Sequence, residues 1–163
     1  MLSLANLFLV AFVALTALIT VIDARTYKIP NKLLIVLSII GLLSLLILSR
    51  EGIGVHLLVA MVTLAIGYFL YLFTGFGAGD AKFFTVIMLW FGADGIIPML
   101  YWFGVCCAVL VLLLVTARRF LDGKQTRLGG WRPLQKGAPV PLALAIGPAA
   151  VITFVMLANN ISF

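Results

Sequence analysis

The chain has 163 residues, of which 64% are hydrophobic and 10% charged, and its mean hydropathy is +1.27. Soluble domains are only about half apolar, so this composition excludes a soluble protein and predicts an all-α, polytopic membrane protein. The formal net charge of +6 is explained by membrane topology, because Lys and Arg collect in cytoplasmic loops, and we expect no nucleic-acid partner. Cys106, Cys107 and His56 lack ligand spacing, so we expect no metal and no cofactor.

Apolar runs divide the chain into candidate membrane helices, each of which needs about 20 residues to cross a bilayer. The runs cover residues 2–22, 33–48, 55–73, 83–116 and 140–158. The fourth run is long enough for two helices, and Asp94-Gly95 within it is a turn signal. The chain therefore contains either five or six membrane helices.

The distribution of basic residues decides between five and six helices. With six, ten of the eleven Lys and Arg fall on one side of the membrane and only Arg50 falls on the other; with five, the division is four against seven. Because basic residues favour the cytoplasm in short loops, we expect six spans with both termini outside, forming a single transmembrane domain over residues 1–163. We place it in the cytoplasmic (inner) membrane, with the basic loop 118–136 against anionic lipids.

This topology puts two aspartates at the same membrane face. Asp23 ends the first helix as it reaches the cytoplasm, and Asp80 opens the fourth helix as it leaves the cytoplasm. Acids beside hydrophobic segments are costly and are therefore functional candidates. Asp80 lies in the stretch 75–82, Gly-Phe-Gly-Ala-Gly-Asp-Ala-Lys, whose glycines allow a second backbone or a substrate to approach closely.

Two neighbouring carboxylates do not readily both ionise, so they tend to share one proton. The ionised member can take a proton from water while the protonated member polarises a carbonyl, which is the chemistry of aspartic proteases. Our hypothesis is that Asp80 starts as the base and Asp23 as the acid. The alternative is that both are interfacial caps, with Lys28 and Lys82 as counter-charges.

Three segments carry a resemblance to one family. Residues 77–82, Gly-Ala-Gly-Asp-Ala-Lys, are similar to the G-x-G-D-x-K signature of type IV prepilin peptidases, which are membrane aspartic proteases. Asp23 followed by Lys28-Ile29-Pro30-Asn31 resembles the second signature, an Asp that ends the first helix before a K-x-P-N turn. Residues 136–147 are similar to the proline-containing segment that opens the last helix of the family.

The resemblance implies an endopeptidase that cleaves the leader of prepilin-like precursors at the cytoplasmic face. Asp23 and Asp80 would be the catalytic pair, and Gly77, Gly79 and Lys82 would contact the substrate. Larger members carry a cysteine-rich insertion after the first helix and also N-methylate the new terminus. Here the connector is short and has no cysteine, so methylation is not expected. The chain looks most like the branch that serves tight-adherence (Flp) pili, or the archaeal prepilin and preflagellin peptidases.

Other interpretations stay open at this stage. Presenilin-type intramembrane proteases share G-x-G-D, but their two acids lie on consecutive helices. A small proton-coupled transporter would use Asp23 and Asp80 as a proton relay, although transport sites favour the membrane midplane. A non-catalytic protein of pilus assembly would tolerate replacement of both acids by Asn. The sequence predicts no particular oligomeric state.

Overall fold

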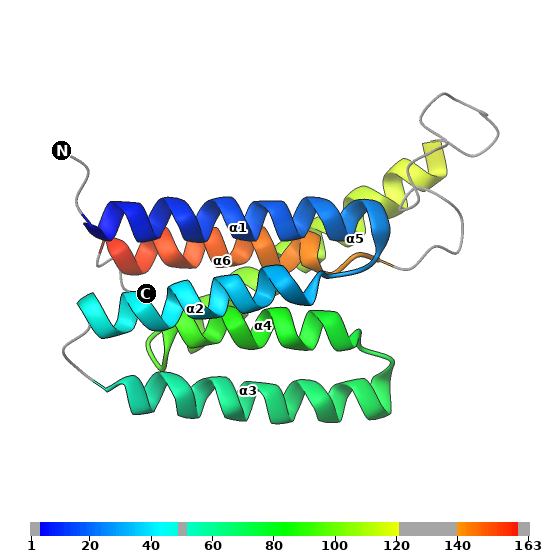
Figure 1. Ribbon diagram of the computed structural model, residues 1–163. Coiled ribbons are helices and arrows are strands. Elements are labelled where there is room, and N and C mark those ends of the chain that lie inside the picture. Colours follow the sequence, from blue (N-terminus) through cyan, green and yellow to red (C-terminus); the bar gives the residue numbers. More distant parts are fainter. Residues whose placement is uncertain (1–3, 49–51, 121–139, 160–163) are drawn as a thin grey trace.

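The computed structural model describes residues 4–48, 52–120 and 140–159. These residues form six helices and no strand, which confirms the predicted all-α fold (Figure 1). The helices are α1 (Leu4–Thr26), α2 (Asn31–Leu48), α3 (Ile53–Thr74), α4 (Ala78–Phe91), α5 (Ile96–Phe120) and α6 (Ala143–Ala158). The run 83–116 is divided at a turn over residues 92–95, as the sequence predicts. Arg50 and most of the basic loop 118–136 lie outside the described residues.

Among the described helices, α1, α2, α3 and α5 are long and apolar enough to cross a membrane. The chain is therefore a multi-pass membrane protein. Helices α4 and α6 are shorter, with 14 and 16 residues. The count of six spans and the orientation of the termini stay predictions.

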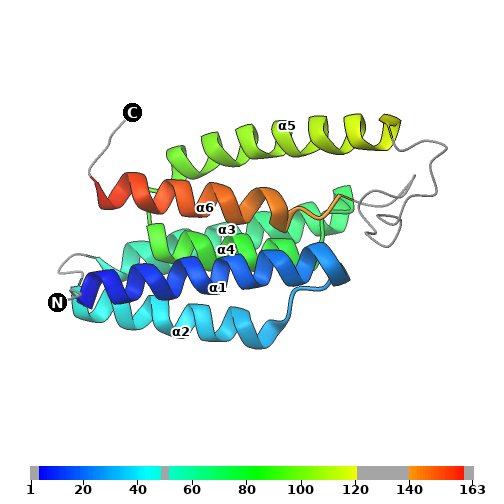
Figure 2. The same ribbon diagram turned by 90° about the horizontal axis from the view of Figure 1, so that it is seen from above.

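Successive helices run in opposite directions along the bundle (Figures 1 and 2). The C-terminal ends of α1, α3 and α5 consequently lie at the same end as the beginnings of α2, α4 and α6. We call this end the aspartate end, because Asp23 lies in the last turn of α1 and Asp80 in the first turn of α4. The helix directions therefore alternate along the chain, as the predicted six spans require.

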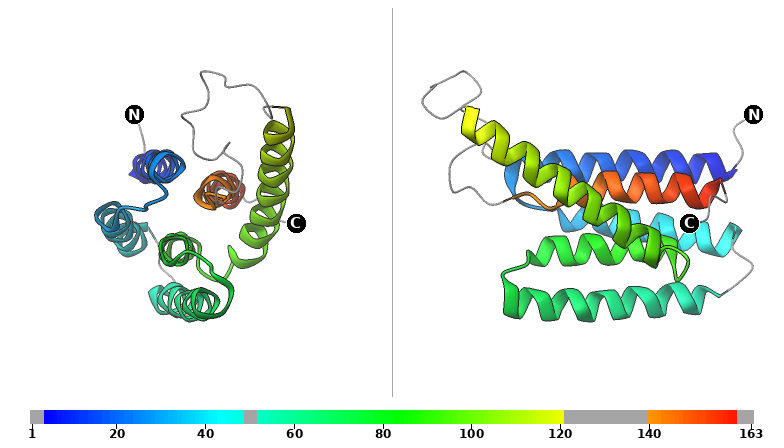
Figure 3. Two further views of the ribbon diagram at one scale, coloured as in Figure 1. Left: turned by 90° about the vertical axis from the view of Figure 1, so that its right-hand side faces the viewer. Right: turned by 180° about the vertical axis from the view of Figure 1, so that it is seen from behind.

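Helix α4 forms the centre of the bundle. It packs against α2, α3 and α6, and Figure 3 shows it between these helices. Every residue from Val86 to Phe91 is buried, and a helix that is apolar all round is typical of such a position. Because protein rather than lipid surrounds it, α4 does not need the length of a lipid-facing helix.

Small residues allow the neighbours of α4 to approach closely, as is usual between membrane helices. A Cβ atom placed on Gly67 of α3 would lie 2.9 Å from the Cβ of Ala81. On the α2 side, the indole ring of Trp90 covers Gly41, where a Cβ would lie 2.6 Å from the indole nitrogen. The indole N–H donates a hydrogen bond of 3.1 Å to the carbonyl of Leu37. The contacts of α4 with α3 and with α2 therefore each depend on a glycine in the neighbouring helix.

We expect Gly67→Ala to destabilise the protein by about 1–3 kcal/mol, the usual cost of overpacking. The new methyl group would collide with the Cβ of Ala81, which is bonded directly to the backbone and has no side-chain rotation by which to move away. The measurement is the thermal unfolding midpoint of purified protein in detergent. Gly54→Ala is the matched control, since Gly54 also lies in α3 and a Cβ atom placed on it would meet no neighbour within 4 Å. Equal midpoints for the two variants would show that α3 and α4 are farther apart than described.

Candidate active site at the aspartate end

Asp23 is held against the beginning of α6. Its side chain is only 5% exposed, and the backbone N–H of Ala143 donates a hydrogen bond to its carboxylate. Ala143 is the first residue of α6, and the amide groups of a first helical turn have no partner within the helix. The positive end of the α6 dipole therefore favours an acid at this position.

Thr20 strengthens the same contact between α1 and α6. Its hydroxyl donates to the carbonyl of Thr16 at 2.8 Å and lies 3.3 Å from the carbonyl of Ala143. Thr20 precedes Asp23 by three residues, so the two side chains lie on one face of α1. Gly147, one turn into α6, leaves the space that the Thr20 hydroxyl occupies. Thr20 and Gly147 thus fix the distance between α1 and α6 beside Asp23.

Asp80 lies in the first turn of α4 and is partly buried. Its carboxylate folds back over Gly77, the N-cap residue of α4, so closely that a Cβ atom on Gly77 would collide with it. The φ angle of Gly77 is −67°, which any residue can adopt. Gly77 is therefore required for space, whereas Gly75 has a φ of +74° and is required for the left-handed turn that ends α3.

The connector between α1 and α2 packs on the glycine-rich segment. Its turn begins at Tyr27, which has a positive φ of 53° and whose N–H donates to the Asp23 carbonyl at 2.8 Å. Two residues later, Ile29 lies against α4, where a Cβ on Gly79 would be 3.4 Å from the Cβ of Ile29. Two segments that are some fifty residues apart in the sequence are therefore in direct contact.

The two carboxylates are near enough to each other to interact electrostatically. Their height in the bundle is set by an aromatic contact at its centre, where the rings of Phe12 and Trp90 are 4.8 Å apart. Asp23 follows Phe12 by 11 residues (23 − 12), and Asp80 precedes Trp90 by 10 (90 − 80). Because α1 and α4 are antiparallel, both acids lie on the same side of this ring contact along the bundle axis. At 1.5 Å per residue, Asp23 is about 16.5 Å from Phe12 and Asp80 about 15 Å from Trp90. The acids therefore reach the same level.

The predicted site residues thus lie at one end of the bundle. Asp23, Asp80, Gly77 and Gly79 are brought together, and Lys82 is exposed on the first turn of α4. Sequence reasoning missed Thr20, Ala143 and Gly147; a Thr in an apolar helix, one turn before the acid, was the available signal. Among the described residues, no group of three His, Cys, Asp or Glu is placed to hold a metal ion.

Comparison with known protein families gives a match over most of the bundle. The chain matches the type IV leader peptidase family over residues 9–114, more than half of its length. This range includes both aspartates and the connector after α1. Neither the comparison with curated proteins nor that with solved structures found a match.

We expect Gly147→Ala to lower the thermal unfolding midpoint in detergent, because the added methyl group collides with the Thr20 hydroxyl; overpacking of this kind costs about 1–3 kcal/mol. Gly104→Ala is the control, since the space around Gly104 is open. Adding Thr20→Ala to Gly147→Ala should restore part of the loss. Absence of any rescue would mean that the contact between α1 and α6 is not what the substitution disturbs.

Proposed function

The chain belongs to the type IV leader peptidase family, and on that premise we propose that it is an aspartic endopeptidase that removes the leader of prepilin-like precursors. The observation that supports the mechanism most is the approach of Asp23 and Asp80 at one end of the bundle. They come from helices between which α2 and α3 intervene, so only lateral packing brings them together. An interfacial cap would not require that approach.

In this mechanism the two acids share one proton. Asp80, the less buried of the two, takes a proton from water, and the water oxygen attacks the scissile carbonyl carbon. Asp23 gives its proton to the carbonyl oxygen. When the tetrahedral intermediate collapses, the C–N bond breaks, the leaving nitrogen takes the proton from Asp80, and one hydroxyl of the intermediate returns its proton to Asp23. Water and the two carboxyl groups supply every proton that the reaction moves.

The aspartate end would face the cytoplasm. The described cations near it are Arg25, Lys28, Lys32, Lys82, Arg118 and Arg119, and basic residues collect on the cytoplasmic side. We therefore propose six spans with both termini outside, in the cytoplasmic membrane, as one peptidase domain. Cleavage would then take place where an apolar precursor helix meets the cytoplasm.

The short connector supports a narrower proposal about the substrate. Only residues 27–30 separate α1 from α2, and they contain no cysteine. We propose that the chain acts as a peptidase of the compact, Flp-type branch, without N-methylation of the new terminus. Gly79 and Lys82 are proposed substrate contacts, whereas Gly77 is proposed to act by positioning Asp80.

The first test is co-expression with a tagged Flp-type prepilin, with leader removal followed by gel shift. We expect Asp23→Asn and Asp80→Asn to lower cleavage by about 10²–10⁴-fold, because Asn keeps the shape of the side chain but cannot transfer a proton. Asp94→Asn is the matched control, since Asp94 is exposed in the turn between α4 and α5. It should cut like wild type.

Membrane levels of each variant must match wild type for this comparison. Cleavage by both Asn variants at the wild-type rate would eliminate the two-aspartate mechanism. A wild-type protein that leaves all tested prepilins uncut would overturn the peptidase proposal itself and make proton-coupled transport the next function to test.

A second test separates the roles of the two glycines. Gly77→Ala should lower cleavage on the order of 10²-fold at unchanged membrane level, because displacing a reacting group by about 1 Å can cost that much. Gly79→Ala should lower cleavage less than Gly77→Ala, because within the protein its methyl group would make only an ordinary contact with Ile29, so that it disturbs the proposed substrate contact but not Asp80. Equal losses in both variants would indicate that the glycines make room for the substrate rather than for Asp80.

A further inference from the structure

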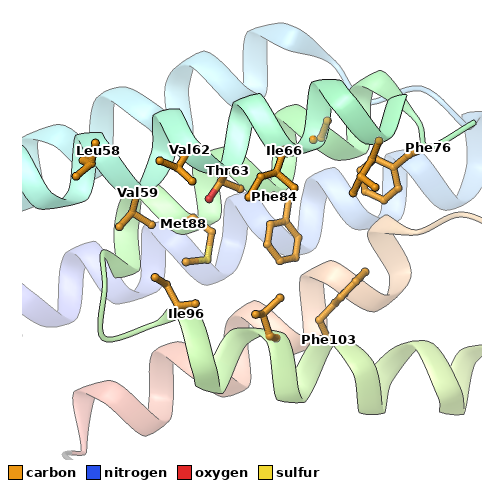
Figure 4. A pocket seen from close by; sticks show the side chains of 14 residues that line it. Leu58, Val59, Val62, Thr63, Ile66, Phe76, Phe84, Met88, Ile96 and Phe103 are labelled. Atoms are coloured by element: carbon orange, nitrogen blue, oxygen red, sulfur yellow. The ribbon is translucent and has the colours of Figure 1, made fainter. Parts of the chain in front are cut away.

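An apolar groove opens on the side of the bundle between α3 and α5, with α4 as its floor (Figure 4). Its volume is about 500 Å³, and we call it the lateral groove. Thr63 supplies the one polar side chain of its lining. The walls and floor include Val62 and Ile66 of α3, Phe84 and Met88 of α4, and Leu100 and Phe103 of α5.

The lateral groove exists because α5 does not follow its neighbours. Helix α5 packs on α6, while α3 packs on α4. Figure 3 shows α5 starting beside α3 and α4 and then crossing α6 at a steep angle. The space between α3 and α5 therefore widens toward the aspartate end, and that side of the bundle has no helix of this chain among the described residues to fill it.

The groove borders the candidate active site. Ala81, the residue next to Asp80, lies in its lining, and so does Phe76 from the glycine-rich stretch. Phe84 follows Asp80 by four residues, so the two side chains lie one turn apart on neighbouring parts of the same helix face. A molecule that fills the groove and extends toward the aspartate end reaches Asp80.

We propose that the lateral groove is the docking site of the apolar helix of the precursor, which enters sideways from the bilayer between α3 and α5. This proposal rests on the proposed function. Docked in this way, the helix would present the peptide bond at its cytoplasmic end to Asp23 and Asp80. The groove would thus select substrates by an apolar helix that directly follows the cleaved bond.

The shape and chemistry of the groove favour a helix as its occupant. An α-helix with side chains is about 10–12 Å across, so 500 Å³ accepts the side chains of one helix face rather than a whole helix. Within a bilayer, helices associate through close packing, because lipid tails are as apolar as leucine. A recess between two helices supplies the packing surface that a single exposed helix lacks.

The experiment uses a photo-crosslinking amino acid, p-benzoylphenylalanine, at Val62 inside the groove and at Leu64 outside it. Both positions lie in α3 and are similarly exposed, at 50% and 46%, but only Val62 lines the groove. Each is placed in full-length Asp80→Asn protein, which holds the precursor uncut, and is co-expressed with the tagged Flp-type prepilin. We expect an adduct with the prepilin helix from Val62 and little from Leu64.

A parallel cleavage assay uses proteins with Asp23 and Asp80 intact. Val62→Trp fills the groove and should lower cleavage on the order of 10²-fold, because the scissile bond is then misplaced. Leu64→Trp should cut like wild type. Both should be present in membranes at the wild-type level.

Each outcome decides the proposal. Wild-type cleavage with equal or no prepilin adducts at the two positions would overturn docking in the groove while the peptidase function stands. Adducts from Val62 that have twice the mass of the chain would overturn docking of the precursor in favour of a second copy of this chain. Adducts from Val62 with lipid alone would overturn it in favour of a lipid acyl chain. A wild-type protein that cuts no prepilin would overturn both the docking and the function on which it rests.

Discussion

The aromatic contact that joins the antiparallel helices α1 and α4 at the centre of the bundle is the constraint on which the candidate site depends. Phe12, Trp90 and Phe154 bring aromatic rings from α1, α4 and α6 together, with centroids 4.7–6.0 Å apart. Large, rigid rings lock the register of the helices that carry them. Asp23 and Asp80 lie almost equally far from this cluster along their helices. The aromatic cluster therefore aligns the two acids along the bundle axis, although it is distant from both of them.

Close approach near the acids depends on small residues. In a bilayer, helices gain little from hiding apolar surface, so packing and hydrogen bonds decide which helices meet. Gly67 brings α3 to α4, and Gly147 brings α6 to the Thr20 hydroxyl. Gly77 leaves room for the carboxylate of Asp80 itself. A glycine of the glycine-rich stretch thus makes room for the carboxylate of Asp80 in the same stretch, in addition to any contact with a substrate.

The bundle is closed on one side and open on the other. The α1, α2 and α6 side positions Asp23, through the Ala143 amide and the turn at Tyr27. On the other side, α5 diverges from α3 and leaves an apolar recess whose lining includes Ala81, the residue next to Asp80. A protease whose substrate lies in the bilayer needs both features. It needs rigidly held acids, and it needs a path to them that does not require the substrate helix to leave the lipid.

The sequence by itself determined the six helices and their alternating directions, because hydropathy and the positions of basic residues can be evaluated segment by segment along the chain. It also determined that Asp23 and Asp80 share one end. Only the tertiary structure decided that the two acids are near enough to interact, that Thr20 and Gly147 hold α1 against α6, and that Gly77 leaves room for the Asp80 carboxylate. The physical reason is that these helices are apolar nearly all round, so no periodic stripe marks the face that meets a neighbour. The lateral groove was equally hidden, because it arises from the tilt of α5, which packing against α6 sets.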